Sequence, residues 1–525
     1  MSYKVLISDT LSPEGVEILK GVPGIEVDVK TGLSREGLKD IIGAYHGLVV
    51  RSATKVTKEI IESAENLTVI GRAGIGVDNI DVDSASRKGI LVMNSPFGSR
   101  VTTAEHTIAL MLALCRQLHI ADSSLRSGVW PKGKLMGMEV YNKTLGIIGL
   151  GNIGGAVAER AKALGMEVIA YDPIISPKRA SDLGVELVGL DDLFRRSDII
   201  TVHTPLTPKT RGMINAEAIK KMKPGVRIIN CARGGIVNEA DLMEAINSGK
   251  VAGAALDVYE TEPLPADHPL LKMDKVLLSP HLGAQTSEAQ RNVSIDIAHQ
   301  LVDFFLNGSV ANAVNFPNLT AEGRTTLEPY ITLAERLGKL QADLNPGPIR
   351  ALELEYRGQV TELDSSILTR AALKGALEGR LGKMNLISAP YLAEEAGVKV
   401  VEREGGKVER FLSLITTISE TDRGRMEISG TLTHGEPRLV SLQGYQVEVE
   451  LKGGLLFITH EPEAKGRLAV TLSEAEVPLS SLHFCSKADT KEALTIARLE
   501  GPLPEAGVGR IKALSGITAC NLVQL

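Results

Sequence analysis

Short runs of Val, Ile and Leu alternate with longer amphipathic stretches through the first part of the chain, up to about residue 285. Such runs, bounded by Gly, Asp, Asn or Pro, are typical of parallel strands that are buried on both faces and joined by helices. We therefore predict two α/β units with Rossmann-like, doubly wound parallel sheets. The runs are KVLIS, IEVDV, GLVVRS, LTVIGRAG and ILVMNSP in the first unit and TLGIIGLG, EVIAYD, IITVHTP, VRIINCA, AGAALDV and KVLLSP in the second.

A glycine-rich turn opens the second unit. Gly149, Gly151 and Gly154 form a G-x-G-x-x-G pattern between a strand-like run and a helical one, and Asp172 ends the next run. Glycines at these positions allow a pyrophosphate to approach the amides at a helix N-terminus. The order of strand, glycines, helix, strand and acid predicts a dinucleotide site. Asp172 would accept hydrogen bonds from a ribose 2′-hydroxyl and repel a 2′-phosphate, which favours NAD over NADP, unless it is only a turn residue before Pro173.

The pattern changes after about Asn315, where several prolines interrupt an otherwise helical region. Between residues 410 and 460 apolar and polar residues alternate strictly, which predicts antiparallel strands. The last 75 or so residues have a βαββαβ pattern. We therefore expect an α+β domain and a small C-terminal domain after the two Rossmann-like ones, with a long helix over 285–307 in the first unit. The expected domains are 1–98 with 286–315, 99–285, 316–452 and 453–525.

Composition excludes several classes of function. The chain has 525 residues with 58 basic and 64 acidic side chains, so nothing global attracts nucleic acid or an anionic membrane. No apolar stretch approaches the roughly 18 to 20 residues that span a bilayer. The four cysteines form no CxxC pair and no metal-ligand spacing, which favours a reducing compartment. Because the N-terminus also lacks a secretory pattern, we expect a cytoplasmic protein with no metal.

Three polar residues lie in segments that follow the later strand-like runs: Arg233 in NCARGGIVNE, Glu262 in DVYETEP and His281 in SPHLGAQT. Together with the glycine turn and IGRAGIGVDN at 70–79, these segments resemble the D-isomer-specific 2-hydroxyacid dehydrogenases. Within them the chain most resembles the long form of the D-3-phosphoglycerate dehydrogenase family, densely over 3–315 and more loosely beyond. The resemblance implies NAD-dependent oxidation of 3-phospho-D-glycerate to 3-phosphohydroxypyruvate, the first step of phosphorylated L-serine biosynthesis.

This chemistry needs the residue types that the three segments supply. Hydride leaves C2 of a 2-hydroxy acid only as the hydroxyl loses its proton, so a base with a pKa near neutrality, His281, must face that oxygen. Glu262 would orient the ring and raise its pKa, and Arg233 would bind the substrate carboxylate and C2 oxygen. From spacing alone each has an ordinary alternative: a histidine satisfied in the core, a glutamate before proline in a loop, and an arginine in a surface ion pair.

The resemblance also assigns binding residues. It places the substrate phosphate at Arg51 and Arg72, and the substrate carboxylate at the backbone amides of Ala73, Gly74, Ile75 and Gly76. Lys132 and Lys134 match a loop that reaches a neighbouring active site in the family, or they are simply solvated. Cys231 would line the cofactor pocket and would not act as a nucleophile. Further cofactor contacts implied by the resemblance are Asn152, Ile153, Thr204, Pro205, Ala232, Arg233, Asp257, His281 and Gly283.

The C-terminal segment 455–525 resembles an ACT domain, a module that commonly binds amino acids between paired copies. It keeps His460, but Pro462 stands where the family pattern has Asn, the following Pro-Gly pair is absent, and EVPLSSLHF replaces the usual segment around Val477. We therefore expect weak or no regulation by L-serine through the usual pocket. An exposed sheet edge in such a domain predicts a homo-oligomer, a dimer or tetramer.

Two alternatives to phosphoglycerate oxidation stay open from the sequence. One is another D-2-hydroxyacid dehydrogenase, of the glycerate or glyoxylate type. The other is an NAD-sensing, corepressor-like binding protein, since such proteins can keep all three of Arg233, Glu262 and His281. The two additional C-terminal domains favour the phosphoglycerate enzyme.

Overall fold

The first unit is a five-stranded sheet in which all strands are parallel, in the order β2-β1-β3-β4-β5. The structure, a computed structural model, describes residues 2–474, 479–487, 490–501 and 505–525. Helix α12 returns from the second unit and packs against α1, β4 and β5. It lies close because Gly71 has no side chain: a Cβ there would sit 2.8 Å from Ile297. The elements are β1 (Tyr3–Ile7), α1 (Pro13–Lys20), β2 (Ile25–Val29), α2 (Arg35–Ile41), β3 (Gly47–Val50), α3 (Lys58–Ser63), β4 (Val69–Arg72), α4 (Val82–Lys88), β5 (Leu91–Asn94) and α12 (Ser287–Asn307).

The second unit is a seven-stranded parallel sheet in the order β12-β11-β10-β9-β6-β7-β8. The chain order reverses at β6, between β9 and β7, and ligands bind outside the carboxyl ends of the strands at such a point. The two-residue strand β8 was not expected from the sequence. The elements are α5 (Arg100–Cys115), α6 (Leu118–Arg126), β6 (Thr144–Ile148), α7 (Asn152–Ala163), β7 (Glu167–Tyr171), α8 (Pro177–Asp182), β8 (Glu186–Leu187), α9 (Leu190–Arg196), β9 (Ile199–Val202), α10 (Ala216–Lys221), β10 (Val226–Asn230), α11 (Glu239–Asn247), β11 (Val251–Leu256) and β12 (Val276–Leu278).

The third unit packs a helix pair, α13 and α14, with a six-stranded sheet in the order β14-β13-β15-β16-β17-β18. The predicted antiparallel strands are confirmed for β15, β16 and β18. Strands β13 and β14, which pair in parallel, were missed, and so was β17 between β16 and β18. Strand β14 lies at the sheet edge and is mostly exposed, so it lacks an apolar alternation. The elements are α13 (Ala321–Leu344), β13 (Ala351–Gly358), α14 (Ser365–Leu381), α15 (Ala389–Glu395), β14 (Lys399–Gly405), β15 (Ser413–Thr421), β16 (Gly424–Thr433), β17 (Glu436–Leu442) and β18 (Tyr445–Glu450).

The fourth unit has the predicted βαββαβ order, folded as an antiparallel sheet β20-β21-β19-β22. Alternate residues of β19 face two cores. Leu456 and Ile458 pack with the helices of this unit, while Leu455 and Phe457 join the core of the third unit. Val477, part of the segment that departs from the family pattern, lies outside the described residues. The elements are β19 (Gly454–His460), α16 (Lys465–Glu474), β20 (Leu479–Ser486), β21 (Ala493–Leu499), α17 (Glu505–Lys512) and β22 (Ile517–Gln524).

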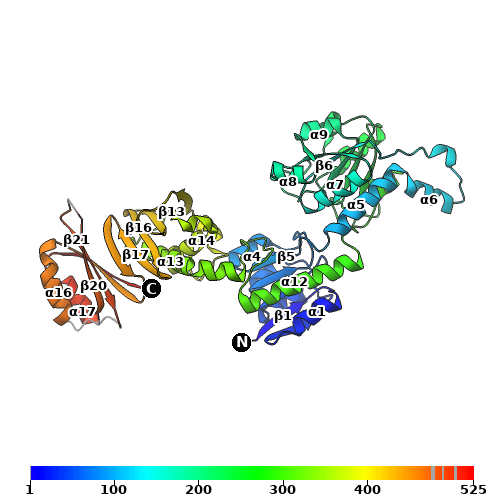
Figure 1. Ribbon diagram of the computed structural model, residues 1–525. Coiled ribbons are helices and arrows are strands. Elements are labelled where there is room, and N and C mark those ends of the chain that lie inside the picture. The colour runs from blue at the N-terminus through cyan, green and yellow to red at the C-terminus, as the bar shows by residue number, and fades with distance from the viewer. Residues whose placement is uncertain (1, 475–478, 488–489, 502–504) are drawn as a thin grey trace.

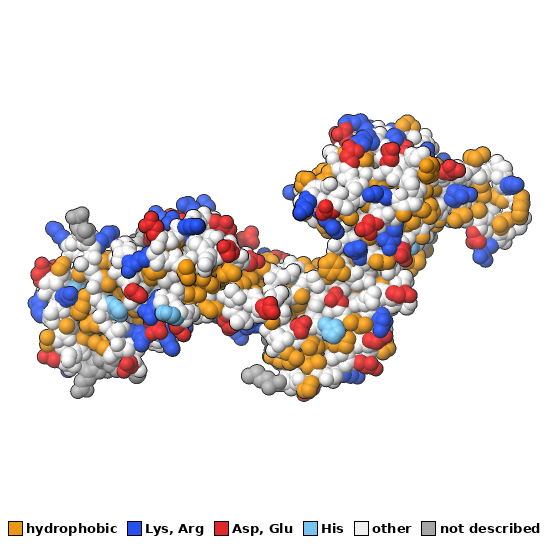
Figure 2. Space-filling model, in the orientation of Figure 1, with side chains coloured by type: hydrophobic (Ala, Val, Ile, Leu, Met, Phe, Trp, Pro, Cys, Tyr) orange, Lys and Arg blue, Asp and Glu red, His pale blue; other side chains and the backbone are white. Residues whose placement is uncertain are grey.

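The units follow one another along an elongated molecule, with the first sheet between the second unit and the two C-terminal ones (Figure 1). Helix α6 and the loop after it project as an arm from the second unit, and no residue of α6 is buried. Trp130 and Met136 on this arm are 78% and 84% exposed. The space-filling view shows apolar side chains on the same arm (Figure 2). No helix among the described residues is long and apolar enough to cross a membrane.

The close packing of α13 and α14 depends on two glycines. A Cβ on Gly338 would lie 2.0 Å from the carbonyl oxygen of Ala372, and one on Gly375 would lie 1.9 Å from that of Glu335. Backbone atoms cannot move aside as a flexible side chain can. The two helices must therefore separate if either glycine gains a side chain.

We expect Gly338→Ala to lower the free energy of unfolding by about 1 to 3 kcal/mol, the usual cost of overpacking. Gly379→Ala is the matched control, because Gly379 also lies in α14 but a Cβ there meets nothing within 4 Å. The control should gain up to about 1 kcal/mol from helix propensity. Thermal unfolding midpoints of both variants test this. A Gly338→Ala protein as stable as the control would contradict the packing argument.

Candidate functional site

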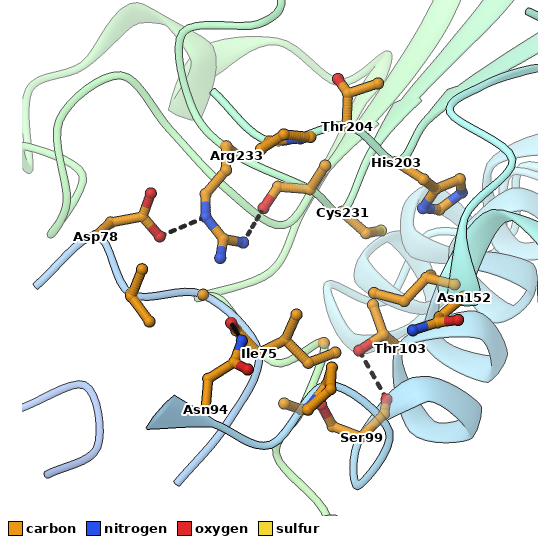
Figure 3. A pocket seen from close by; sticks show the side chains of 18 of the residues that line it. Ile75, Asp78, Asn94, Ser99, Thr103, Asn152, His203, Thr204, Cys231 and Arg233 are labelled. Carbon is orange, nitrogen blue, oxygen red and sulfur yellow. Dashed lines mark hydrogen bonds and ion pairs between the residues drawn. The ribbon is translucent and has the colours of Figure 1, made fainter. Parts of the chain in front are cut away.

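Two adjacent cavities lie where the first and second units meet. The larger has a volume of about 410 Å³ and the smaller about 330 Å³, and Arg72, Ser99, His281 and Ala284 line both. Figure 3 shows side chains from both units converging on the larger one. Of the residues predicted from sequence, the larger cavity brings together Arg72, Ile75, Gly76, Asn152, Ile153, Thr204, Pro205, Cys231, Ala232, Arg233, Asp257, His281 and Gly283. Arg51, Gly74 and Glu262 line the smaller one.

The glycine turn has the geometry that its sequence implies. Gly149 has φ +92°, which favours glycine, and a Cβ on Gly154 would lie 2.0 Å from the carbonyl oxygen of Gly149. A Cβ on Gly151 would meet nothing within 4 Å, so open space lies in front of it. The Asp172 carboxylate accepts a hydrogen bond from the Leu150 amide at 2.9 Å and thus sits directly beside the turn.

The residues around this turn fit a dinucleotide. Helix α7 begins at the turn without a side-chain cap, so its first amides are free to bind an anion. Two buried polar atoms beside the larger cavity, Nδ1 of His203 and Oγ1 of Thr204, have no hydrogen-bond partner among the described residues. Burial lowers the pKa of His203 to about 3, so its ring is neutral. Burial raises the pKa of Cys231 to about 12, so this side chain is a thiol.

His281 and Glu262 form a close pair. Nδ1 of His281 lies 2.7 Å from Oε2 of Glu262, whose other oxygen accepts a hydrogen bond from the Tyr259 amide at 3.1 Å. The hydrogen bond with Glu262 raises the pKa of His281 despite partial burial of the ring. Burial favours the neutral form of Glu262, but the hydrogen bonds from His281 and Tyr259 outweigh it and lower the pKa of Glu262. Nδ1 therefore carries the proton, which leaves Nε2 as the basic atom.

Asp257 holds the loop that carries His281. The backbone of His281 has φ +56°, an unfavourable value for a side chain other than glycine. The Asp257 carboxylate accepts hydrogen bonds from the amides of Leu282 at 2.7 Å and Gly283 at 2.8 Å, and the Asp257 carbonyl accepts one from the His281 amide. Ser279 and His106 also contact this fully buried carboxylate. Burial alone would raise the pKa of Asp257, but these hydrogen bonds outweigh it and lower the pKa.

Three arginines concentrate positive charge at the two cavities. Burial lowers the pKa of Arg72 to about 10, and the positive charges of Arg233 and Arg51 contribute to this shift. Nε of Arg72 is buried and has no partner among the described residues. The guanidinium groups lie against glycines: a Cβ on Gly74 would clash with Arg72, and one on Gly76 with Arg233. The acids near these arginines, Asp9 and Asp78, offset their mutual repulsion only in part, so the cavities retain a positive charge that favours an anion.

Arg233 is held across the gap between the two units. Its Nε donates to Oδ2 of Asp78 at 2.7 Å, and Nη1 donates to the Ala232 carbonyl at 2.6 Å, as the dashed lines in Figure 3 show. These contacts leave Nη2 for a ligand. Asp78 belongs to the first unit and Arg233 to the second, so the pair orients the guanidinium where the units meet.

Several residues at the site were not predicted from the sequence. Asp78 lies inside the segment 70–79 that was already noted, and His203 directly precedes Thr204, so both were within reach of motif analysis. Ser279 is the first residue of SPHLGAQT, the segment that contains His281, so it too was within reach of motif analysis. The others carry no motif, because they reach the site only through the packing of α5 and β5 on their neighbours. They are Asn94, Ser99, Thr103 and His106.

Some predicted residues are not among the described residues that line the two cavities. Gly149, Gly151, Gly154 and Asp172 form the turn behind Asn152 and Ile153. Lys132 and Lys134 lie on the projecting arm.

Two family models match the chain. The model of the D-isomer specific 2-hydroxyacid dehydrogenase NAD binding domain matches residues 108–283. The model of the D-3-phosphoglycerate dehydrogenase intervening domain matches residues 326–443. Among curated proteins, the D-3-phosphoglycerate dehydrogenase of Archaeoglobus fulgidus is 42% identical over 99% of this chain and all of its own length. That of Bacillus subtilis is 36% identical over the full length of both chains. The human protein is 44% identical over 76% of this chain and 74% of its own.

Solved structures resemble the first two units. The NAD⁺-bound 3-phosphoglycerate dehydrogenase of Entamoeba histolytica is 30% identical and covers 60% of this chain and 99% of its own, with a TM-score of 0.52. A D-lactate dehydrogenase of Aquifex aeolicus, complexed with NAD and lactic acid, is 29% identical over 60% of this chain and all of its own, with a TM-score of 0.53. From these relatives and the two family models it follows that the chain belongs to the D-3-phosphoglycerate dehydrogenase family of D-isomer-specific 2-hydroxyacid dehydrogenases.

Proposed function

We propose that His281, Glu262 and Arg233 carry out the reaction of this family, the NAD-dependent oxidation of 3-phospho-D-glycerate to 3-phosphohydroxypyruvate. The observation that carries this assignment is the 2.7 Å pair of His281 and Glu262 in a cavity shared with Arg72. It supplies a base beside a concentration of positive charge, which suits a substrate with both a carboxylate and a phosphate. The full-length relatives favour this substrate over the glycerate and corepressor alternatives.

The mechanism follows from the protonation states. Nε2 of His281 takes the proton of the C2 hydroxyl, and the negative charge of Glu262 stabilises the resulting imidazolium. Arg233 binds the substrate carboxylate and the C2 oxygen through its free Nη2. NAD, when bound at Asn152, Ile153 and Asp172, supplies the hydride acceptor. Asp257 keeps the His281 loop in its unfavourable conformation and thereby fixes the direction of the base.

The substrate phosphate belongs at Arg51 and Arg72. Both line the smaller cavity, next to His281 and the backbone of Gly74. Burial and, to a smaller extent, the charges of Arg233 and Arg51 lower the pKa of Arg72, and a phosphate with up to two negative charges would compensate for both effects. The backbone amides of residues 73–76 supply further donors for the carboxylate.

We also propose that the C-terminal unit is an ACT-like domain and that the protein is a homo-oligomer. The exposed apolar residues of the arm and the edge strands β20 and β22 are surfaces on which a second copy could pair. His460 is a poor ligand for an effector, because its Nδ1 donates to the Glu461 carbonyl and its Nε2 contacts the Thr495 hydroxyl. This supports weak or absent control by L-serine. The cytoplasmic location stays a prediction.

Replacing His281 by Ala should lower kcat about 10²- to 10⁴-fold, the usual effect of losing a general base. NAD binding should persist, since the glycine turn is untouched. His299→Ala, a change on the exposed face of α12, is the control and should leave both unchanged. Absorbance at 340 nm gives turnover and NAD titration gives binding. A His281→Ala protein with turnover within a few-fold of the wild type would assign the base to another group.

Replacing Glu262 by Gln should move the acid limb of the pH profile to lower pH. Oxidation needs neutral His281, so kcat/KM falls as pH drops below the His281 pKa. Glu262 raises that pKa, and its neutral replacement removes the cause. Glu260→Gln is the control. Glu260 lies two residues before Glu262 but is not among the described lining residues of either cavity, so this change should leave the acid limb at the same pH. A limb that stays fixed or moves to higher pH in Glu262→Gln would contradict the pairing.

Replacing Asp172 by Ala should raise the KM for NAD more than it changes kcat, and should narrow the preference for NAD over NADP. The reason is loss of the acceptor for the ribose 2′-hydroxyl and of its repulsion toward a 2′-phosphate. Asp182→Ala, an exposed acid at the end of α8, serves as control. Equal efficiency of the wild type with both cofactors would refute this role for Asp172.

A further inference from the structure

The third unit contains a separate cavity of about 470 Å³ between α14, α15 and β14. Its wall combines apolar side chains, among them Leu373 and Val398, with four charged ones. The charged residues are Arg370, Glu394, Lys399 and Glu402. The cavity lies within the intervening unit and shares no lining residue with the two cavities of the dehydrogenase site.

The four charged side chains are not neutralised by one another. Nearby charges are paired: Arg87 with Glu395, and Arg403 with Glu353 at 2.9 Å. Among the described residues no ion pair within 4.0 Å involves any of the four that line the cavity. Arg370 instead donates from Nη1 to the carbonyl of Leu386 at 3.1 Å and lies 5.4 Å from the centre of the Phe316 ring. Burial lowers the pKa of Arg370, and the charges of Asp364 and Glu402 offset this effect only in part, since neither carboxylate forms an ion pair with the guanidinium within 4.0 Å.

We infer that this cavity binds a free α-amino acid. The carboxylate would be recognised by Arg370 and Lys399, the ammonium by Glu394 and Glu402, and the side chain by the apolar wall. Because the wall carries two positive and two negative side chains, it favours one class of ligand over another. A phosphoester, with up to two negative charges, would meet both glutamates unfavourably, whereas a zwitterion matches both pairs.

The position of the cavity couples it to the substrate-binding unit. Arg370 holds the carbonyls of Leu386 and Ile387, and the adjacent Asn385 donates from its side chain to the Gly89 carbonyl at 2.7 Å. Gly89 ends α4, the helix that follows the loop with the proposed carboxylate-binding amides of residues 73–76, and α15 packs on α4. A ligand carboxylate that binds Arg370 would therefore change the hydrogen bonds of Arg370 to the 386–387 carbonyls, and with them the neighbouring contact between Asn385 and Gly89. Such coupling is reciprocal: if the ligand changes the affinity for the substrate, the substrate changes the affinity for the ligand by the same factor.

The test is calorimetry of the full-length protein with each common L-amino acid in turn. We expect at least one to bind saturably and to change the KM for 3-phosphoglycerate. Glu402→Gln and Lys399→Gln, both on the edge strand β14, should each weaken binding about tenfold, as for loss of one charged contact. Glu404→Gln is the matched control, since Glu404 is also exposed on β14 but does not line the cavity, and should bind as the wild type does.

Two results would overturn the inference: no saturable binding of any amino acid, or binding that Glu402→Gln and Lys399→Gln leave unchanged, which would place the ligand elsewhere. Binding without an effect on the KM would overturn the coupling to α4. Basal turnover of these variants should equal that of the wild type. The outcome is thus independent of the roles proposed for His281, Glu262 and Arg233.

Discussion

The meeting of two parallel sheets at their carboxyl ends is the constraint on which the rest of this protein depends. Every strand of both sheets runs in one direction, so the loops that follow the strands converge on one gap. Arg72 is the last residue of β4 in the first sheet, while Arg233 and His281 follow strands of the second. No short segment of the chain could bring these groups together. The ion pair of Arg233 with Asp78 joins the two units at this point.

Charge placement at the gap explains the division of labour among its residues. Asp257 is buried and fully engaged with loop amides and side chains, so it shapes the loop. Glu262 has one oxygen on His281 and the other on a backbone amide, so it tunes the base. Nearby acids neutralise Arg51, Arg72 and Arg233 only in part, so these arginines can bind the carboxylate and the phosphate of the substrate. The two carboxylates, Asp257 and Glu262, thus take different roles because their hydrogen-bond partners differ.

Much of this architecture could be predicted from the sequence, because parallel strands buried on both faces leave continuous apolar runs. The runs predicted eleven of the twelve strands in the first two units, and Gly149, Gly151 and Gly154 predicted the turn. The short strand β8 and the exposed edge strand β14 left no such pattern. Asn94, Ser99 and His106 could not be predicted, since they join the site through packing between units. The grouping of charges around Arg370 could not be predicted either, because it depends on how α14, α15 and the exposed strand β14 pack, and these charged residues form no motif.

The substrate arginines carry the central claim, since they distinguish a phosphorylated substrate from other 2-hydroxy acids. The most direct measurement compares kcat/KM for 3-phospho-D-glycerate and for D-glycerate with NAD, by absorbance at 340 nm. The account predicts a value for the phosphorylated substrate at least tenfold higher, since one lost charge-assisted contact already corresponds to about that factor. Equal or better efficiency with D-glycerate would contradict it.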